Sequence, residues 1–117
     1  MLKIDERTKK ISLTRGDTAY LTFPLTDNVT GNPYQMGAND ILALSIKKDF
    51  GDQQKMALQK VSKGTNYVHI TPEDTKSLKF GTYKYEVELT KANGDIFTII
   101  GAETQNKIPE FEILPEA

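Results

Sequence analysis

The side chains that most readily carry out chemistry are scarce in this chain. It has one histidine, His69, and no cysteine, so it offers neither a histidine pair for a metal nor a thiolate nucleophile. His69 and Tyr67 share one side of an expected strand, which indicates a surface or strand-packing role. No serine, lysine or carboxylate pair is spaced as a nucleophile with its base. These observations favour a protein that is not an enzyme and that uses no metal or other cofactor.

Several aspartates lie near expected strand ends, where the loops of a β-sandwich can cluster and bind calcium. The sequence contains no D-x-D-x-D-G loop, and aspartates are common at turns because they hydrogen-bond to the nearby backbone. The pattern therefore favours turns over a metal site. The residues concerned are Asp27, Asp40, Asp49, Asp52 and Asp95.

The tripeptide Arg15-Gly16-Asp17 is one that integrins recognise, which suggests an adhesive role. A structural interpretation has a clearer physical basis. Gly16 tolerates a positive φ, and Asp17 can accept hydrogen bonds from backbone amides at the start of the next strand. We therefore expect a turn here.

Tyrosine rings suggest a different kind of site, because an exposed aromatic face can stack on the apolar face of a sugar. Tyr83 and Tyr85 alternate in step with Val87 and Leu89, which indicates that both rings pack in the core. The candidates for a glycan-binding face are then Tyr20, Tyr34 and Tyr67.

Strands must position these residues, because alternation with a period of two recurs along the chain and a sustained helical stripe does not. Residues 41–48 are apolar on both sides, as in a central strand, whereas Pro24 indicates an edge or a bulge. Turn formers make 27–40 one irregular loop, with Tyr34 and Met36 turned back onto the core. The eight expected strands are 11–14, 18–27, 41–48, 56–61, 66–70, 82–90, 96–100 and 110–114.

One helix start is visible, where Thr71 can cap and Pro72 fits the first turn. It predicts a short helical turn near 72–78 that crosses from one sheet to the other, and Asn93-Gly94 predicts a hairpin. The fold class is then all-β, an antiparallel immunoglobulin-like β-sandwich of seven to eight strands. The expected organisation is a flexible N-terminal segment 1–10, one sandwich domain 11–114 and a C-terminal tail 115–117.

Charge and hydropathy exclude several classes of partner. Fifteen basic residues balance 16 acidic ones, leaving no cationic excess for nucleic acid or an anionic membrane. Residues 1–10 are too charged for the apolar centre of a signal peptide. The longest apolar run, around Ile99 and Ile100, is far shorter than the ~20 residues of a membrane helix. We expect synthesis in the cytoplasm.

A combination of strand and turn motifs extends over most of the chain, from about Ile11 to Leu114. In these motifs the chain resembles the β-sandwich domains of phage and prophage tail or baseplate proteins from Gram-positive bacteria. It is similar to the N-terminal domain of the phage baseplate upper protein family. The motifs are Ile11-Ser-Leu-Thr-Arg-Gly-Asp17, Thr71-Pro-Glu-Asp-Thr75, Leu78-Lys-Phe-Gly-Thr-Tyr-Lys-Tyr-Glu-Val87, Asn93-Gly94 and 96–101.

The resemblance implies a structural component of the virion without catalytic residues. Its partners would be other phage structural proteins or copies of itself, and it would be made in the bacterial cytoplasm before joining the virion. Sheet edges, loops and the terminal segments 1–10 and 102–117 are the expected contact regions. The alternative is a bacterial carbohydrate-binding or adhesion module that uses exposed Tyr20, Tyr34 or Tyr67.

Overall fold

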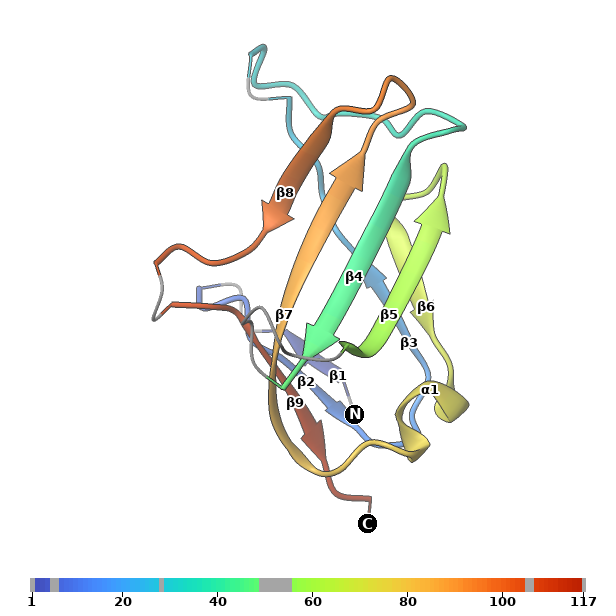
Figure 1. Ribbon diagram of the computed structural model, residues 1–117, viewed down its shortest axis with the longest axis vertical. Coiled ribbons are helices and arrows are strands. Elements are labelled where there is room, and N and C mark those ends of the chain that lie inside the picture. The colour runs from blue at the N-terminus through green and yellow to red at the C-terminus, as the bar shows by residue number, and fades with distance from the viewer. Residues whose placement is uncertain (1, 5–6, 28, 49–55, 105–106, 117) are drawn as a thin grey trace.

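The computed structural model describes residues 2–4, 7–27, 29–48, 56–104 and 107–116, and it is a β-sandwich with one short helix (Figure 1). All eight predicted strands are present, and the helix lies where Thr71 and Pro72 predict it. The elements are β2 (Ile11–Thr14), β3 (Ala19–Thr22), β4 (Ile41–Lys47), β5 (Met56–Lys63), β6 (Tyr67–Ile70), α1 (Pro72–Lys76), β7 (Gly81–Thr90), β8 (Ile96–Ile100) and β9 (Glu110–Leu114).

A further strand, β1 (Leu2–Ile4), precedes the predicted ones. It pairs antiparallel with β2, with Leu2 opposite Leu13. The sheet therefore begins at Leu2 rather than at Ile11, where the sequence places the start of the sandwich domain. Three residues, one of them a lysine, are too short a run to show alternation, so pairing with β2 is what defines this strand.

The large sheet has the order β1-β2-β9-β7-β4-β5, and β8 also pairs with β7; β3 and β6 form the second, smaller sheet. Strand β9 pairs with β7 over 81–84 and β8 pairs with it over 87–90, so both lie along the same side of β7, end to end (Figure 1). Strand β4 lies along the other side, between β5 and β7, as the central strand that its sequence predicts. This arrangement leaves a break in pairing between β8 and β9.

The strand order resembles that of immunoglobulin-like sandwiches. The rows β9-β7-β4-β5 and β3-β6 correspond to the G-F-C-C′ and B-E strands of a variable-type domain. One pair departs from the predicted antiparallel arrangement, because β2 runs parallel to β9, with Ile11 opposite Phe111. The alternation of each strand predicts which residues face inward but not the direction of its neighbour, so this pair could not be predicted from the pattern.

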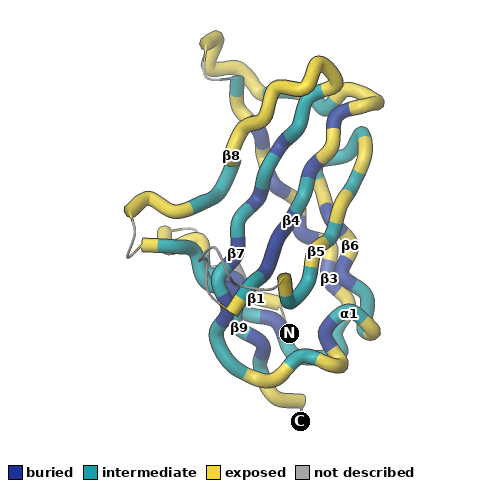
Figure 2. The backbone as a smooth tube through the Cα atoms, in the orientation of Figure 1, coloured by how far each residue is buried: buried dark blue, intermediate teal, exposed yellow. Residues whose placement is uncertain are grey.

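The core lies between the two sheets, where alternate residues of each strand meet (Figure 2). Strand β7 alternates between buried and partly exposed positions along most of its length, and Tyr34 and Met36 pack against the core from the 27–40 loop, as predicted. Strand β3 is an edge strand, as Pro24 predicts, but it ends at Thr22, whereas the alternation predicts a strand over 18–27. The largest fully buried side chains are Tyr85, Phe111, Ile11, Leu13, Leu21, Leu42, Leu44, Ile46, Ile70, Ile113, Val68 and Val87.

The Arg15-Gly16-Asp17 tripeptide is a structural turn. The Arg15 guanidinium lies 4.0 Å from the centroid of the Phe80 ring and forms an ion pair with Glu116 at 3.0 Å. Gly16 has a φ of 86°, and its N–H donates to the hydroxyl of buried Thr75 at 2.8 Å. The turn and the positive φ of Gly16 agree with the structural interpretation, and the contacts with Thr75 and Glu116 additionally fix the turn to the helix and to the C-terminal segment.

Tyr83 forms the corner that is typical of immunoglobulin-like folds. It lies near the start of β7, and its hydroxyl donates to the Lys79 carbonyl oxygen at 2.8 Å, four residues upstream. We expect Tyr83→Phe to lower the free energy of unfolding by about 1 kcal/mol, because it removes one hydrogen bond and little packing. Urea unfolding checks this, with Tyr67→Phe as the matched change on an exposed tyrosine; equal losses would contradict a role for the corner.

Candidate functional site

The three candidate tyrosines do not form one surface. Tyr20 and Tyr67 lie on the outward face of the small sheet, where pairing of β3 with β6 places Tyr20 opposite His69. The Tyr20 and His69 rings are stacked, with centroids 4.3 Å apart and planes at 4°, and the Tyr67 ring lies 6.3 Å from that of Tyr20. We call Tyr20, Tyr67 and His69 the aromatic face. His69 was not among the predicted site residues, although its shared side with Tyr67 was visible in the sequence.

Tyr34 belongs to a different part of the molecule. Its hydroxyl donates to Asp40 Oδ2 at 2.5 Å, and the same carboxylate accepts hydrogen bonds from the Gly37 N–H at 2.9 Å and the Ala92 N–H at 3.1 Å. The Lys91 ammonium lies 4.8 Å from the Tyr34 ring centroid. Tyr34 therefore helps to fix the 27–40 loop to the turn between β7 and β8, and it is not part of the aromatic face.

Ionisation of the Asp40 carboxylate should make the free energy of unfolding depend on pH in the acid range. Its hydrogen bonds, the Tyr34 hydroxyl first and the Gly37 amide next, lower the pKa of Asp40 below the ordinary 3.8. Its stabilisation is complete above pH 3.8 and is lost as the pH falls through the lower folded-state pKa. Replacing Asp40 by asparagine should make the urea midpoint fall less between about pH 5 and about pH 2 than it does in the unmodified chain. Equal slopes for Asp40→Asn and the parent would contradict this.

The other candidate aspartates that the structure describes form hydrogen bonds with residues close by in the sequence. Asp27 accepts hydrogen bonds from the Val29 and Thr30 amides, which lower the pKa of its carboxyl, and Asp95 pairs with the Asn93 side chain. Asp49 and Asp52 lie outside the described residues. Within the described ranges, no group of three or more histidines and acids is placed to hold a metal ion. In the same ranges, no helix combines the length and apolar character needed to cross a membrane.

The free edge of β8 is the most unusual surface feature. Among the described strands β8 pairs only with β7, so its other side is open. Natural edge strands are usually protected by charge, proline or a covering loop, but the sequence of β8, Ile-Phe-Thr-Ile-Ile, contains no charge and no proline. Ile96 and Phe97 are 61% and 41% exposed. An uncharged, apolar and open edge of this kind is a template for pairing with another strand.

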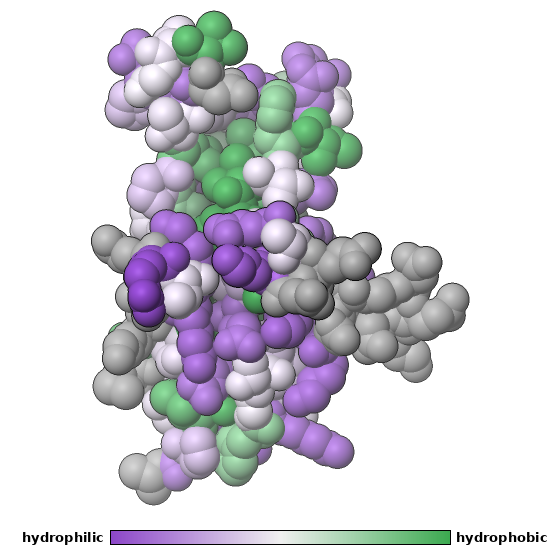
Figure 3. Space-filling view, turned by 90° about the vertical axis from the view of Figure 1, so that its left-hand side faces the viewer, coloured by the Kyte–Doolittle hydropathy of each residue, from purple (hydrophilic) through white to green (hydrophobic). Residues whose placement is uncertain are grey.

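An apolar groove follows the first part of β8. It has a volume of about 590 Å³ and lies between β8 and the segment after β3. Among the described strands β2 pairs with β1 and β9, and β9 pairs with β7 only over 81–84, so no described strand covers β8 on this side. In Figure 3 the upper part of this side carries hydrophobic side chains above a hydrophilic band. The apolar lining is Pro24, Leu25, Val29, Leu89, Phe97 and Ile99.

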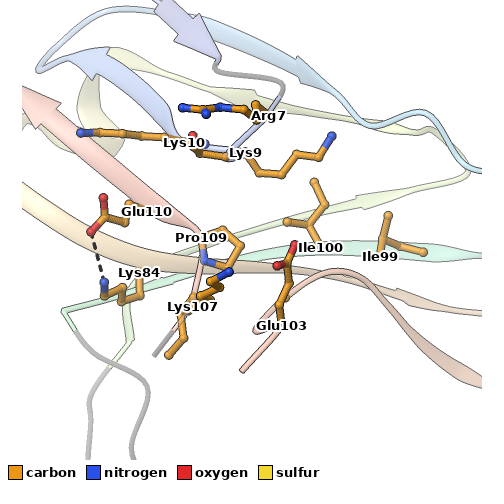
Figure 4. A pocket seen from close by; sticks show the side chains of 13 residues that line it. Arg7, Lys9, Lys10, Lys84, Ile99, Ile100, Glu103, Lys107, Pro109 and Glu110 are labelled. Atoms are coloured by element: carbon orange, nitrogen blue, oxygen red, sulfur yellow. Dashed lines mark hydrogen bonds and ion pairs between the residues drawn. The ribbon is translucent and has the colours of Figure 1, made fainter. Parts of the chain in front are cut away.

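A basic pocket follows the other end of β8, where β8 and β9 separate. It has a volume of about 670 Å³, and Ile99 lines both this pocket and the apolar groove. Five cationic side chains and two carboxylates line it, an excess of three positive charges in a chain whose net charge is −1. In Figure 4 the cations of 7–10 lie on one side, and Lys107 and Glu103 lie on the other. The charged lining is Arg7, Lys9, Lys10, Lys84, Lys107, Glu103 and Glu110.

Neither pocket was predicted from the sequence. The basic pocket joins residues from 7–10, from β7 and from 99–110, and these segments meet only through the pairing of β2, β9, β7 and β8. One signal for the β8 edge was available, namely the absence of charge from 96–100. Comparison with known proteins adds no assignment, because no protein-family model and no curated protein matches the chain.

Proposed function

We propose that this chain is a non-enzymatic structural protein of a phage or prophage virion, a tail or baseplate component that acts through protein–protein contacts. The resemblance of its strand and turn motifs to tail and baseplate sandwich domains supports a place in the tail or baseplate of a virion. In this proposal the protein is made in the bacterial cytoplasm and then joins the virion, where it contacts other structural proteins.

The observation that carries the assembly role is the open β8 edge. Ile96 and Phe97 stay exposed on a strand that has one free side and an apolar groove beside it. Exposed apolar surface next to an unpaired edge is unfavourable in a free protein and is characteristic of surfaces that another chain covers.

The test is mass spectrometry of particles purified after induction of the encoding strain. We expect the chain in a fixed ratio to the tail proteins, and its gene among genes for tail or head assembly. Absence from the particles, or a gene inside a polysaccharide-degradation cluster, would contradict the proposal.

A second candidate function is supported by the aromatic face. Tyr20 is 60% exposed and lies beside His69 and Tyr67 on the outer side of the small sheet, a grouping that suits an adhesion module that contacts sugars. Titration with bacterial cell-wall glycans should then shift the NMR signals of these three residues. An unchanged spectrum over a broad glycan panel would exclude this candidate, and Tyr34 should not respond directly.

A further inference from the structure

The apolar groove and the basic pocket are consecutive along β8. Phe97, Thr98 and Ile99 line the groove, and Ile99, Ile100 and Gly101 line the pocket. A strand that pairs with the free edge of β8 would therefore pass apolar side chains at one end and cationic side chains at the other.

The pairing of β8 with β7 shows which β8 side chains face inward. Phe97 lies opposite Leu89 and Ile100 lies opposite Val87, and both partners are buried. The register shifts between Val87 and Glu88, which is the mark of a β-bulge; such bulges concentrate at sheet edges and redirect side chains. An added strand would extend this inner surface and would need apolar residues at alternate positions to cover it.

The charges of the basic pocket are not all neutralised within the chain. Lys84 pairs with Glu110 at 3.2 Å, and Lys10 pairs with Glu112 at 3.6 Å. Lys9 and Lys107 are exposed and line the pocket without such an ion pair among the described residues. These two ammonium groups are therefore available to an acidic partner, and an anion there would meet a local excess of positive charge.

The backbone that carries Lys9 is held in an uncommon conformation. Lys9 has a φ of 63°, the one described non-glycine residue with a positive φ. The hydroxyl of Tyr85, which is 1% exposed, donates to the Lys9 carbonyl oxygen. A buried group on β7 thus fixes the position of the Lys9 backbone at the rim of the pocket.

We infer that the β8 edge receives an extended segment of a partner protein, with alternating apolar residues beside the groove and acidic residues beside Lys9 and Lys107. The segment pairs with β8 as an added strand. Its apolar side chains cover Phe97 and Ile99, and its carboxylates face the two ammonium groups. This inference rests on the proposed assembly function and specifies the chemistry of the partner.

The test uses the full chain labelled with 15N and a short synthetic peptide in which two glutamates precede alternating threonine and isoleucine. A second peptide has lysines in place of the glutamates. The acidic peptide should shift the β8 amides and slow their hydrogen exchange, because the added strand bonds to the free edge. Its affinity should exceed that of the lysine peptide at least tenfold and should fall as salt is added.

Two sets of variants test the assignment of residues. The double change Lys9→Glu and Lys107→Glu should lower the affinity for the acidic peptide at least tenfold. Phe97→Ser should lower the affinity for both peptides. The control is Lys63→Glu with Lys79→Glu, which changes net charge equally at exposed positions away from the pocket. It should change affinity less than twofold.

Several outcomes would overturn the inference. They are equal binding of the two peptides, shifts outside β8 and the pocket, an equal loss in the control variant, or no binding. Light scattering that shows a dimer through β8, insensitive to the acidic peptide, would make a second copy the occupant instead. The comparison of the two peptides needs no variant, so it stands even if a variant fails to fold. If the chain is found in virions but binds neither peptide, the proposed function stands and this inference is rejected.

Discussion

Replacing Phe111 by alanine is expected to lower the free energy of unfolding by about 3–5 kcal/mol, the usual cost of removing a buried phenylalanine. Phe111 is 0% exposed, and its ring meets that of Tyr85 edge to face, with centroids 6.2 Å apart and planes at 84°. Strand β9 is paired on both sides, so the surrounding backbone has little freedom to fill the cavity. A loss of this size is a large part of the 5–15 kcal/mol that typically stabilises a domain.

Urea unfolding followed by far-ultraviolet circular dichroism measures this effect. Phe97→Ala is the matched control, because it removes the same ring from a partly exposed position on β8 and should cost at most about 1 kcal/mol. Similar losses for the two variants would contradict the assignment of Phe111 to the core and of Phe97 to a partly exposed position at the sheet edge.

The second large effect concerns the ionisation of Tyr85. Burial raises the pKa of Tyr85 from 10.0 to about 12. Between these values the unfolded chain loses the phenol proton while the folded chain keeps it. The contribution of Tyr85 is therefore complete below pH 10 and is lost as the pH rises towards 12. The chain should lose stability over this range, and Tyr85→Phe should reduce that loss.

Tyrosinate absorbance offers a direct measurement, since the chain has five tyrosines and no tryptophan. Tyr85→Phe should remove one ionisation near pH 12 from the absorbance titration of the folded protein. The hydrogen bond to Asp40 also raises the pKa of Tyr34 above 10.0, so Tyr34 is a second tyrosine that ionises at high pH. If the Tyr85→Phe variant still shows every ionisation that the unmodified protein shows at high pH, the raised pKa does not belong to Tyr85.

Much of the fold could be predicted because its strands carry strong local signals. The alternation of Tyr83 and Tyr85 with Val87 and Leu89 locates β7 and its buried side, and all four residues are buried. Asn93-Gly94 makes the hairpin between β7 and β8, with a φ of 95° at Gly94. Each of these features depends on neighbouring residues alone.

The features that the sequence analysis missed depend on distant pairing. The parallel contact of β2 with β9, and the sharing of one side of β7 by β8 and β9, are choices of hydrogen-bonding partner that alternation does not encode. The candidate tyrosines share a residue type but lie on separate elements, and only the pairing of β3 with β6 brings Tyr20 and Tyr67 together. The basic pocket has the same origin, because Lys9 and Lys107 are far apart in the chain.

The position of β9 also has a consequence for how the chain folds during synthesis. Strand β9 lies between β2 and β7, so among the described strands β9 alone joins β2 and β1 to the rest of the sheet. The pairing of Ile11 with Phe111 closes a loop that includes nearly the whole chain, and contacts of such long sequence separation form slowly. The β1–β2 hairpin therefore cannot pair with the rest of the sheet until residues 110–114 have left the ribosome. A ribosome-bound chain stalled before residue 110 should expose this hairpin to proteases and chaperones, while the released protein should protect it.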